Sequence, residues 1–482
     1  MATDPALRRL ALRTLLAAFP GEVPPPWAVD LVGEGLAGHT LFGFNIVDDA
    51  QVAATTAALR AGRTDVLVAI DEEGGDVTRL DHGSGSPYPG NAALGAVDDV
   101  AVTRAVYRSI GADLAALGIN LDLAPTVDVN TADDNPIIGT RSFGADPARV
   151  AAHSAAAVEG LQEAGVAACA KHFPGHGATV TDSHLELPTV DVSPDVLAAR
   201  DLPPFAAVVA AGAKAVMTAH IRVPALTGEL PATFSRRVLV DLLRGELGFT
   251  GAIVTDALEM KGASILAGGT AQAAPLALAA GADLLCIGAD VDAALVEETA
   301  AEIAAAIADG RLTGARVEEA AARTEALAAW AGPRIDAEGV PSGLGYEAAV
   351  RAVRVEGEPP RGGPSLVVQL AAAATIAEGR VPWGLEPHLR DVEHVRVAAA
   401  DARADELLAR AGDRPIVVVT RHAHRLPGAA PLIEALAARH PVTVVEMGWP
   451  SSWRPAGVVA VVLTYGASHA NGRAAAEVLG LR

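Results

Sequence analysis

Eight short apolar segments follow one another in the first two thirds of the chain, and stretches with helical periodicity separate them. The segments span residues 15–19, 41–45, 66–70, 119–124, 166–170, 215–218, 252–255 and 283–287. Short strands that alternate with helices pair in parallel, because each helix carries the chain back to the same end of the sheet. Eight such units favour a closed (β/α)8 barrel over an open sheet. We therefore predict an α/β fold built on a barrel.

A smaller α/β domain is predicted after the barrel. Helical periodicity continues over 293–307 and 315–330, and the stretch 332–364 is rich in Gly, Pro and charge. Strand-like segments return at 366–369, 416–420, 442–446 and 458–463, with a helix at 431–438. No glycine-rich phosphate fingerprint opens a helix there, so we expect no nucleotide site. The predicted domains are 1–331 for the barrel, 332–364 for a linker and 365–482 for the small domain.

The charge balance excludes a nucleic-acid-binding surface, which needs clustered Lys and Arg. Acidic residues number 58 against 37 basic ones, for a net charge of -21. Cys169 and Cys286 both lie in apolar segments, which is typical of small core residues in a reducing compartment. Residues 1–14 favour an amphipathic helix over a signal peptide, and no stretch reaches the ~20 apolar residues that span a bilayer. We expect a cytoplasmic protein without a membrane partner.

Polar or charged side chains stand where most of the apolar segments end. These residues are Asp71, Asp128, Lys171, His172, His220 and Asp256. In a (β/α)8 barrel the active site is built from the carboxyl ends of the strands and the loops that follow them. A single polar residue at a strand end is unremarkable, but six in equivalent positions predict a site at that face.

Asp71 begins the first of three groups that suggest chemistry. It opens the run Asp71-Glu72-Glu73-Gly74-Gly75, and Arg79 follows within a few residues. The glycines allow a tight turn, and a carboxylate with an arginine suits the hydroxyl groups of a polyol. An acidic loop that forms a salt bridge with Arg79 explains the same residues equally well.

The second group is the run 171–177, Lys-His-Phe-Pro-Gly-His-Gly, with Asp182-Ser183-His184 after it. Imidazoles and a carboxylate are metal ligands, so a metal-dependent barrel hydrolase is one hypothesis. Lys171 speaks against it, because its cation would lie beside the metal. The other hypothesis is a dyad in which Asp182 orients His184 as a proton donor and acceptor near neutral pH.

The third group is Thr255-Asp256-Ala257-Leu258-Glu259-Met260, in which an aspartate ends an apolar strand. A carboxylate held at that point is suited to nucleophilic attack. Aspartate is also a favoured N-cap, so Asp256 could equally begin the following helix.

Together these groups resemble glycoside hydrolase family 3. The resemblance rests on four ordered motifs, 71–75, Asn135-Pro136-Ile137-Ile138-Gly139-Thr140-Arg141-Ser142-Phe143, 171–177 with 182–184, and 255–260. Within the family the chain is most similar to the β-N-acetylglucosaminidases of bacterial cell-wall recycling. The motifs lie within residues 10–330, so the resemblance covers the predicted barrel.

The resemblance implies a retaining exo-β-N-acetylglucosaminidase that needs neither a cofactor nor a metal. Asp256 would be the nucleophile, His184 the general acid/base and Asp182 its partner. The residues that would line the sugar pocket are Asp71, Arg79, Arg141, Lys171 and His172. A retaining glycosidase forms a covalent sugar on one carboxylate while a second group protonates the leaving oxygen, and here a histidine replaces the usual second carboxyl.

Other functions remain open at this point. A neutral imidazole repels an anion less than a carboxylate does, so phosphate could replace water as the acceptor. The remaining alternatives are the metal-dependent hydrolase and an inactive sugar-binding protein, although the latter would be expected to lack Asp256 or His184. Two departures from the family pattern, Ala178 and Asp76, touch no proposed catalytic residue. The small domain resembles the family's α/β sandwich, and we expect it to support packing.

Overall fold

The computed structural model describes residues 4–332, 343–360 and 364–482. They divide into two compact units by their internal contacts, and each unit is considered by itself. The first contains the described residues of 1–72, 103–136 and 145–341, and the second those of 73–102, 137–144 and 342–482. The predicted division at 331 and 365 stays a prediction, and the structure assigns two inner segments, 73–102 and 137–144, to the second unit.

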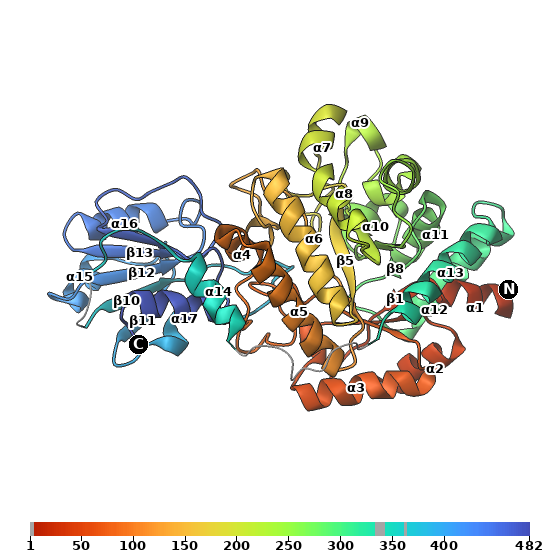
Figure 1. Ribbon diagram of the computed structural model, residues 1–482, viewed down its shortest axis with the longest axis horizontal. Coiled ribbons are helices and arrows are strands. Elements are labelled where there is room, and N and C mark those ends of the chain that lie inside the picture. Colours follow the sequence, from red (N-terminus) through yellow and green to blue (C-terminus); the bar gives the residue numbers. More distant parts are fainter. Residues whose placement is uncertain (1–3, 333–342, 361–363) are drawn as a thin grey trace. The chain divides into compact units, whose positions relative to one another are not determined.

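The first unit is a parallel barrel (Figure 1). In the described part of the chain its strands are β1 (Leu15–Ala17), β2 (Gly38–Leu41), β3 (Leu67–Ile70), β4 (Leu121–Asp122), β5 (Ala167–Phe173), β6 (Ala215–Thr218), β7 (Ala252–Thr255) and β8 (Leu285–Cys286). Their order is β7-β6-β5-β4-β3-β2-β1-β8, and every pair within it is parallel. A parallel bridge between Val254 and Leu284 joins β7 to β8. The predicted (β/α)8 barrel is confirmed.

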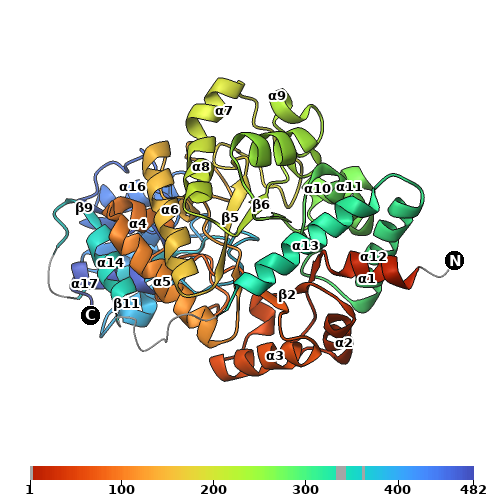
Figure 2. The ribbon, with the colours of Figure 1, turned by 45° about the vertical axis from the view of Figure 1, so that its right-hand side comes forward.

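Helices surround this barrel, and Figure 2 shows α5, α6, α8, α12 and α13 along its outside. The helices of the first unit are α1 (Pro5–Leu12), α2 (Pro26–Glu34), α3 (Asp49–Gly62), α5 (Val100–Ala116), α6 (Pro147–Glu163), α7 (Pro194–Arg200), α8 (Leu202–Ala210), α9 (Pro224–Thr227), α10 (Lys261–Ala267), α11 (Thr270–Ala280), α12 (Ala293–Ala308) and α13 (Gly314–Trp330). Residues 237–246 form a π-helix. Alternate strand residues such as Leu67 and Ala69 share one apolar cluster, as a period of two requires.

The second strand begins earlier than predicted. The apolar run suggested 41–45, whereas β2 is Gly38–Leu41 and Gly43–Asn45 is a 3-10 turn. The strand residues His39 and Thr40 are polar but buried, so hydropathy did not reveal them. Gly38 is required there, because a Cβ would lie 2.1 Å from the carbonyl oxygen of Leu67 on β3.

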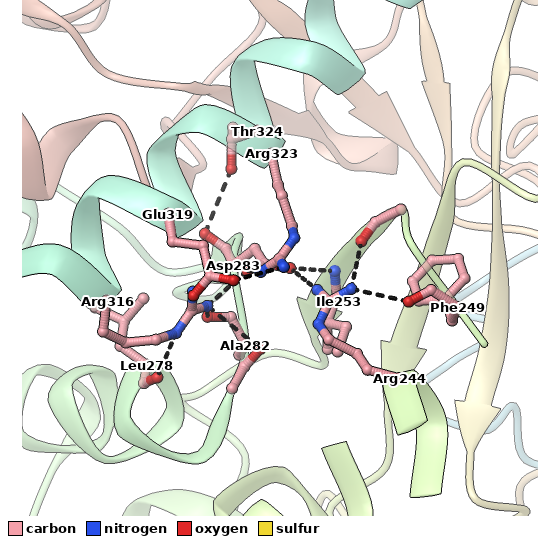
Figure 3. A network of polar contacts seen from close by, with 12 residues as sticks. Arg244, Phe249, Ile253, Leu278, Ala282, Asp283, Arg316, Glu319, Arg323 and Thr324 are labelled. Atoms are coloured by element: carbon pink, nitrogen blue, oxygen red, sulfur yellow. Dashed lines mark hydrogen bonds and ion pairs between the residues drawn. The ribbon is translucent and has the colours of Figure 1, made fainter. Parts of the chain in front are cut away.

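At the amino end of β8, opposite the predicted site, a buried carboxylate collects three arginines (Figure 3). Asp283 binds Arg244, Arg316 at 2.5 Å and Arg323 at 3.2 Å, and it also accepts the Ile253 N–H at 2.9 Å. Arg244 lies on the π-helix and the other two arginines on α13, so the cluster connects three elements. This end of a barrel generally serves stability.

The second unit contains a mixed sheet between two layers of helices. Its described strands are β9 (Arg354–Gly357), β10 (Leu366–Leu370), β11 (Glu393–Val397), β12 (Ile416–Thr420), β13 (Val442–Glu446) and β14 (Ala460–Leu463), and its helices are α4 (Asn91–Val97), α14 (Leu344–Ala352), α15 (Ala404–Ala411), α16 (Ala429–Ala437) and α17 (His469–Val478). The order β11-β10-β12-β13-β14-β9 is parallel except for β9. Val418 and Val419 point into different apolar clusters, so both faces are covered. The predicted α/β sandwich is confirmed.

Two of these strands were not predicted from the sequence. All four residues of β9 are exposed, and β11 is only half-buried at the other edge of the sheet. Edge strands with charged residues carry little hydropathy signal. β9 and α14 lie inside the predicted linker 332–364, of which 333–342 and 361–363 fall outside the described residues.

Across the described residues, no single helix is long and apolar enough to cross a membrane. α10 and α11 pass the test of length and composition only as a pair, and they are bent by 95° to each other.

Candidate active site

Strand ends of the barrel bring together the predicted residues of the first unit. Asp71 follows β3 directly, Lys171 and His172 lie near the end of β5, and Asp256 follows β7 directly. Because the strands are parallel, these ends lie at the same face of the barrel. His184 lies on the loop that follows β5.

A buried ion pair connects β5 with the loop after β3. Lys171 Nζ donates to Asp71 Oδ1 at 2.6 Å, and the exposed fractions of the two side chains are 3% and 18%. A buried ammonium is stable only when paired, so this contact fixes the direction of the lysine side chain. Both groups then present oriented polar atoms at the barrel mouth.

Asp128 organises the loop after β5, although the sequence assigned it no role beyond its strand-end position. Its Oδ2 accepts from His172 Nδ1 at 2.7 Å, and its Oδ1 accepts from the His176 backbone N–H at 2.6 Å. Burial raises the pKa of Asp128, but the interactions with His172 and His176 outweigh burial and hold that pKa below its ordinary value. The carboxylate therefore stays ionised and holds His172 in the tautomer that donates from Nδ1.

His176 uses both ring nitrogens within its own loop. Nδ1 lies 2.7 Å from Thr179 Oγ1, and Nε2 lies 3.1 Å from Ser183 Oγ. Burial lowers the pKa of His176 to about 4, so the ring is neutral at physiological pH. As to the metal hypothesis, the described part of the chain contains no group of three His, Cys, Asp or Glu residues that could hold a metal ion.

The predicted dyad is formed on this loop. Asp182 Oδ1 accepts from His184 Nδ1 at 2.7 Å and from the His184 backbone N–H at 2.9 Å. Burial raises the pKa of Asp182, but its hydrogen bonds with His184 outweigh burial and lower the pKa overall. An ionised Asp182 fixes Nδ1 as a donor, so Nε2 is the nitrogen of His184 that can exchange a proton with a ligand.

Asp256 is a buried carboxylate among imidazoles. Burial raises its pKa, whereas interactions with His220, His172 and His184 and the Ala257 N–H lower it, and the net shift is downward. The Ala257 N–H donates to Oδ1 at 2.8 Å. Asp256 caps no helix, because α10 begins at Lys261 with Met260 as its N-cap residue.

Two glycines bring this loop close to its surroundings. A Cβ at Gly177 would lie 2.0 Å from the carbonyl oxygen of Val129, so no other residue fits there. The Gly262 N–H at the start of α10 donates to the carbonyl of Ser183 at 3.2 Å. This bond connects the residue beside His184 to the helix that follows Asp256.

Arg79 and Arg141 belong to the second unit. Arg141 donates to both oxygens of Glu73, at 2.7 and 3.0 Å, and Arg79 donates to the carbonyls of Ala377 and Glu378. Their predicted contact with a ligand therefore stays a prediction. The salt bridge that the sequence suggested for the acidic loop is made by Arg141.

Two further polar residues of the barrel were not given a role. Asp122 is buried at the end of β4 and accepts the Glu72 N–H at 3.0 Å, and burial raises its pKa well above the usual value. His220 follows β6 and lies beside Asp256. Its strand-end position was the only signal in the sequence, because no motif surrounds it.

Comparison with known families gives a match for residues 28–327 with the family described as "Glycosyl hydrolase family 3 N terminal domain". The chain is 40% identical over 263 residues to "Beta-hexosaminidase A" of Pseudoalteromonas piscicida, which covers 50% of this chain and 44% of that protein. It is 39% identical over 260 residues to "Beta-hexosaminidase" of Xanthomonas campestris pv. campestris (strain B100), which covers 53% of this chain and 77% of that protein.

Among solved structures, the fold matches a glycoside hydrolase family 3 β-N-acetylglucosaminidase from Paenibacillus sp. str. FPU-7. The TM-score is 0.90 at 33% identity, and the match covers 98% of this chain and 96% of that one. The chain thus matches less than half of the Pseudoalteromonas protein but nearly all of the Paenibacillus structure.

Proposed function

Because the chain belongs to glycoside hydrolase family 3, we propose that it is a retaining exo-β-N-acetylglucosaminidase that releases terminal N-acetylglucosamine from β-linked cell-wall fragments. The observation that carries the proposal is the Asp182–His184 hydrogen bond on the loop after β5, with the buried carboxylate of Asp256 at the end of β7. The names of the bacterial relatives support the choice of sugar. The cytoplasm as its location stays part of this proposal.

In the first step Asp256 attacks the anomeric carbon with Oδ2, since Oδ1 accepts the Ala257 N–H. The bond between that carbon and the leaving oxygen breaks, and its electron pair goes to the oxygen. Protonated His184 supplies a proton from Nε2 to the same oxygen. Asp182 stabilises the imidazolium before the transfer and keeps Nε2 directed at the substrate.

In the second step His184, now neutral, takes a proton from water at Nε2. The water oxygen bonds to the anomeric carbon, and the bond to Asp256 breaks to return the free carboxylate. Two displacements at one carbon retain its configuration. If phosphate occupies the place of water, the same step yields a sugar phosphate.

Asp71, Lys171 and His172 would hold the sugar hydroxyls. The Lys171–Asp71 pair offers a fixed donor and acceptor, and His172 is held through Nδ1 so that its Nε2 is available for a ligand. Arg79 and Arg141 are assigned to the sugar by sequence resemblance alone.

The test of substrate and acceptor compares a chromogenic β-N-acetylglucosaminide with the matching β-glucoside, each with and without phosphate. We expect faster release from the N-acetylglucosaminide and no dependence on phosphate. A rate that rises with phosphate, with sugar phosphate as product, would identify a phosphorylase.

The test of the nucleophile uses an activated 5-fluoro analogue, which slows breakdown of the covalent intermediate. We expect mass spectrometry to find the sugar on Asp256. Asp256→Asn should fold normally and lose almost all turnover, by three orders of magnitude or more, about the loss expected when a nucleophile is removed. A label on another residue would disprove the assignment.

A further inference from the structure

His220 lies on the segment after β6 and is fully buried. Its Nδ1 lies 2.7 Å from Thr233 Oγ1, and its Nε2 lies 3.0 Å from the carbonyl oxygen of Ala257. Thr233 Oγ1 is in turn 2.8 Å from Thr218 Oγ1 on β6. A chain of hydrogen bonds therefore runs from β6 to the residue that follows Asp256.

The partners of the ring determine its tautomer. A carbonyl oxygen only accepts, so Nε2 carries the proton and donates to Ala257. Burial lowers the pKa of His220, so the ring stays neutral and Nδ1 accepts from the Thr233 hydroxyl. Thr233 has one hydroxyl proton, and Nδ1 lies nearer to its oxygen than the Ala219 carbonyl does, at 2.7 against 3.1 Å.

The peptide that His220 holds is directly attached to the proposed nucleophile. The Ala257 carbonyl accepts from His220, while the Ala257 N–H donates to Asp256 Oδ1 at 2.8 Å. Rotation of the backbone at Ala257 would disturb both bonds together. The direction in which Asp256 presents Oδ2 therefore depends on where His220 holds that carbonyl.

The position of His220 leaves little freedom. A Cβ at Gly262, near the start of α10, would lie 3.0 Å from the His220 Cβ and 3.1 Å from its carbonyl oxygen. The helix after Asp256 thus contacts the His220 backbone, while the imidazole bonds to the peptide before that helix. Both ends of the 256–262 segment are held by one residue.

We propose that His220 is a positioning residue for the nucleophile: its Nε2–H holds the Ala257 carbonyl, and Thr233 fixes the tautomer that makes this donation possible. The inference rests on the proposed function, in which Asp256 attacks the sugar. His220 does not touch the reacting atoms. Its loss affects the orientation of Asp256 rather than sugar binding.

Two amides of different length give a matched test. In His220→Gln the side-chain nitrogen reaches about as far as Nε2 and can donate to the Ala257 carbonyl. In His220→Asn the amide reaches only about as far as Nδ1, so it can contact Thr233 but not Ala257. We expect the asparagine variant to lose about 100-fold in kcat with little change in KM, the usual cost of a misplaced reacting group. The glutamine variant should recover at least tenfold of that loss.

A second measurement separates this inference from the proposed function. The rate at which the 5-fluoro analogue labels Asp256 should fall in His220→Asn by the same factor as kcat. If the wild-type protein is not labelled at Asp256, the proposed function fails. If the wild type is labelled and both amide variants are labelled equally fast, or only KM changes, the role of His220 is wrong.

Thr233→Val provides the variant that keeps the imidazole. It removes the donor to Nδ1 without changing the shape of the side chain, so His220 loses the partner that selects its tautomer. We expect a loss of kcat smaller than that of His220→Asn, with an unchanged midpoint of thermal unfolding measured as a fold control. Wild-type kcat in this variant would overturn the part assigned to Thr233.

Discussion

Three histidines of one loop differ in the partner of each ring. His172 and His184 each donate from Nδ1 to a carboxylate, whereas His176 faces two hydroxyls. A carboxylate partner stabilises an imidazolium, and hydroxyl groups do so much less. Of the three, His184 is therefore the residue suited to carrying a proton, and His176 to holding the loop.

The first prediction concerns the leaving group. If His184 protonates the leaving oxygen, His184→Ala should lose far more rate on alkyl glycosides than on an activated nitrophenyl glycoside, which departs without a proton. Steady-state kinetics on both substrates measures the difference, and general acid catalysis contributes about 100- to 10,000-fold. Asp182→Asn should show the same pattern in milder form. Equal losses on both substrates would indicate a binding role.

The second prediction concerns pH and His39 on β2. Burial lowers the pKa of His39 to about 4 from 6.5, and its Nε2 donates to the Ala28 carbonyl. Above pH 6.5 the ring is neutral in both states, so His39 costs nothing. As pH falls towards 4 the unfolded chain binds the proton first, and the stability of the fold decreases.

His39→Gln keeps a donor for Ala28 and removes the titration. The loss of unfolding free energy between pH 7 and 4 should be smaller in this variant by up to about 3 kcal/mol, the value of a shift of roughly 2.5 pH units. Urea unfolding at both pH values measures it. The same loss in both proteins would contradict the prediction. His176, also neutral, leaves part of the acid sensitivity in place.

At the scale of elements, the loop after β5 is held by protons and hydrogen bonds between its own residues. Its hydroxyl and carboxylate partners account for three imidazoles without a metal ion. We predict that activity survives prolonged EDTA treatment and that the purified protein contains no stoichiometric transition metal. Loss of activity on chelation, restored by zinc, would overturn the dyad.

The Asp283 cluster connects β8, the π-helix and α13, and it predicts a loss of stability without loss of function. Asp283→Asn leaves three arginines without their buried carboxylate, which should cost about 3–5 kcal/mol. Thermal and urea unfolding measure the change. Asp309→Asn is the matched control, because its pair with Arg311 is exposed and should contribute within about 0.5 kcal/mol. At a temperature where Asp283→Asn is folded, kcat/KM should equal that of the wild type.

At the scale of the whole molecule, the chain order and the two compact units do not coincide. Segment 73–102 precedes most of the barrel in sequence but makes its contacts with the second unit. Asp76 accepts from Arg421 at 3.1 Å and from the Ala467 N–H at 2.7 Å, and Arg351 binds Asp99 at 2.9 Å. The second unit thus needs residues from the first hundred of the chain.

This arrangement predicts the behaviour of a chain that ends at residue 331. The truncated protein keeps 73–102 and 137–144 but lacks the residues that cover them, including the apolar side of α4. We expect it to aggregate or to unfold at a lower temperature than the full chain. Coexpression of residues 343–482 should restore solubility. A monomeric fragment with the full chain's midpoint would show that these segments need no cover.

Much of the barrel could be predicted because its signal is local. Val66 to Ile70 or Ala252 to Thr255 is apolar on both faces, as a strand covered by helices must be. Asp256 and the Asp182–His184 pair were also predicted, since the first ends a strand and the others are two residues apart. β2 and β9 were missed because their buried polar and exposed residues depart from that pattern.

The sequence alone determined the fold class, the family resemblance and which residues stand at strand ends, because apolar periodicity and short motifs are properties of neighbouring residues. The tertiary structure decided the partners. It paired Lys171 with Asp71, one hundred positions away, and placed His220 on the peptide after Asp256. It also assigned Arg141 to Glu73 in the second unit. Such contacts depend on how distant strands and loops meet, and no local pattern in the chain encodes that meeting.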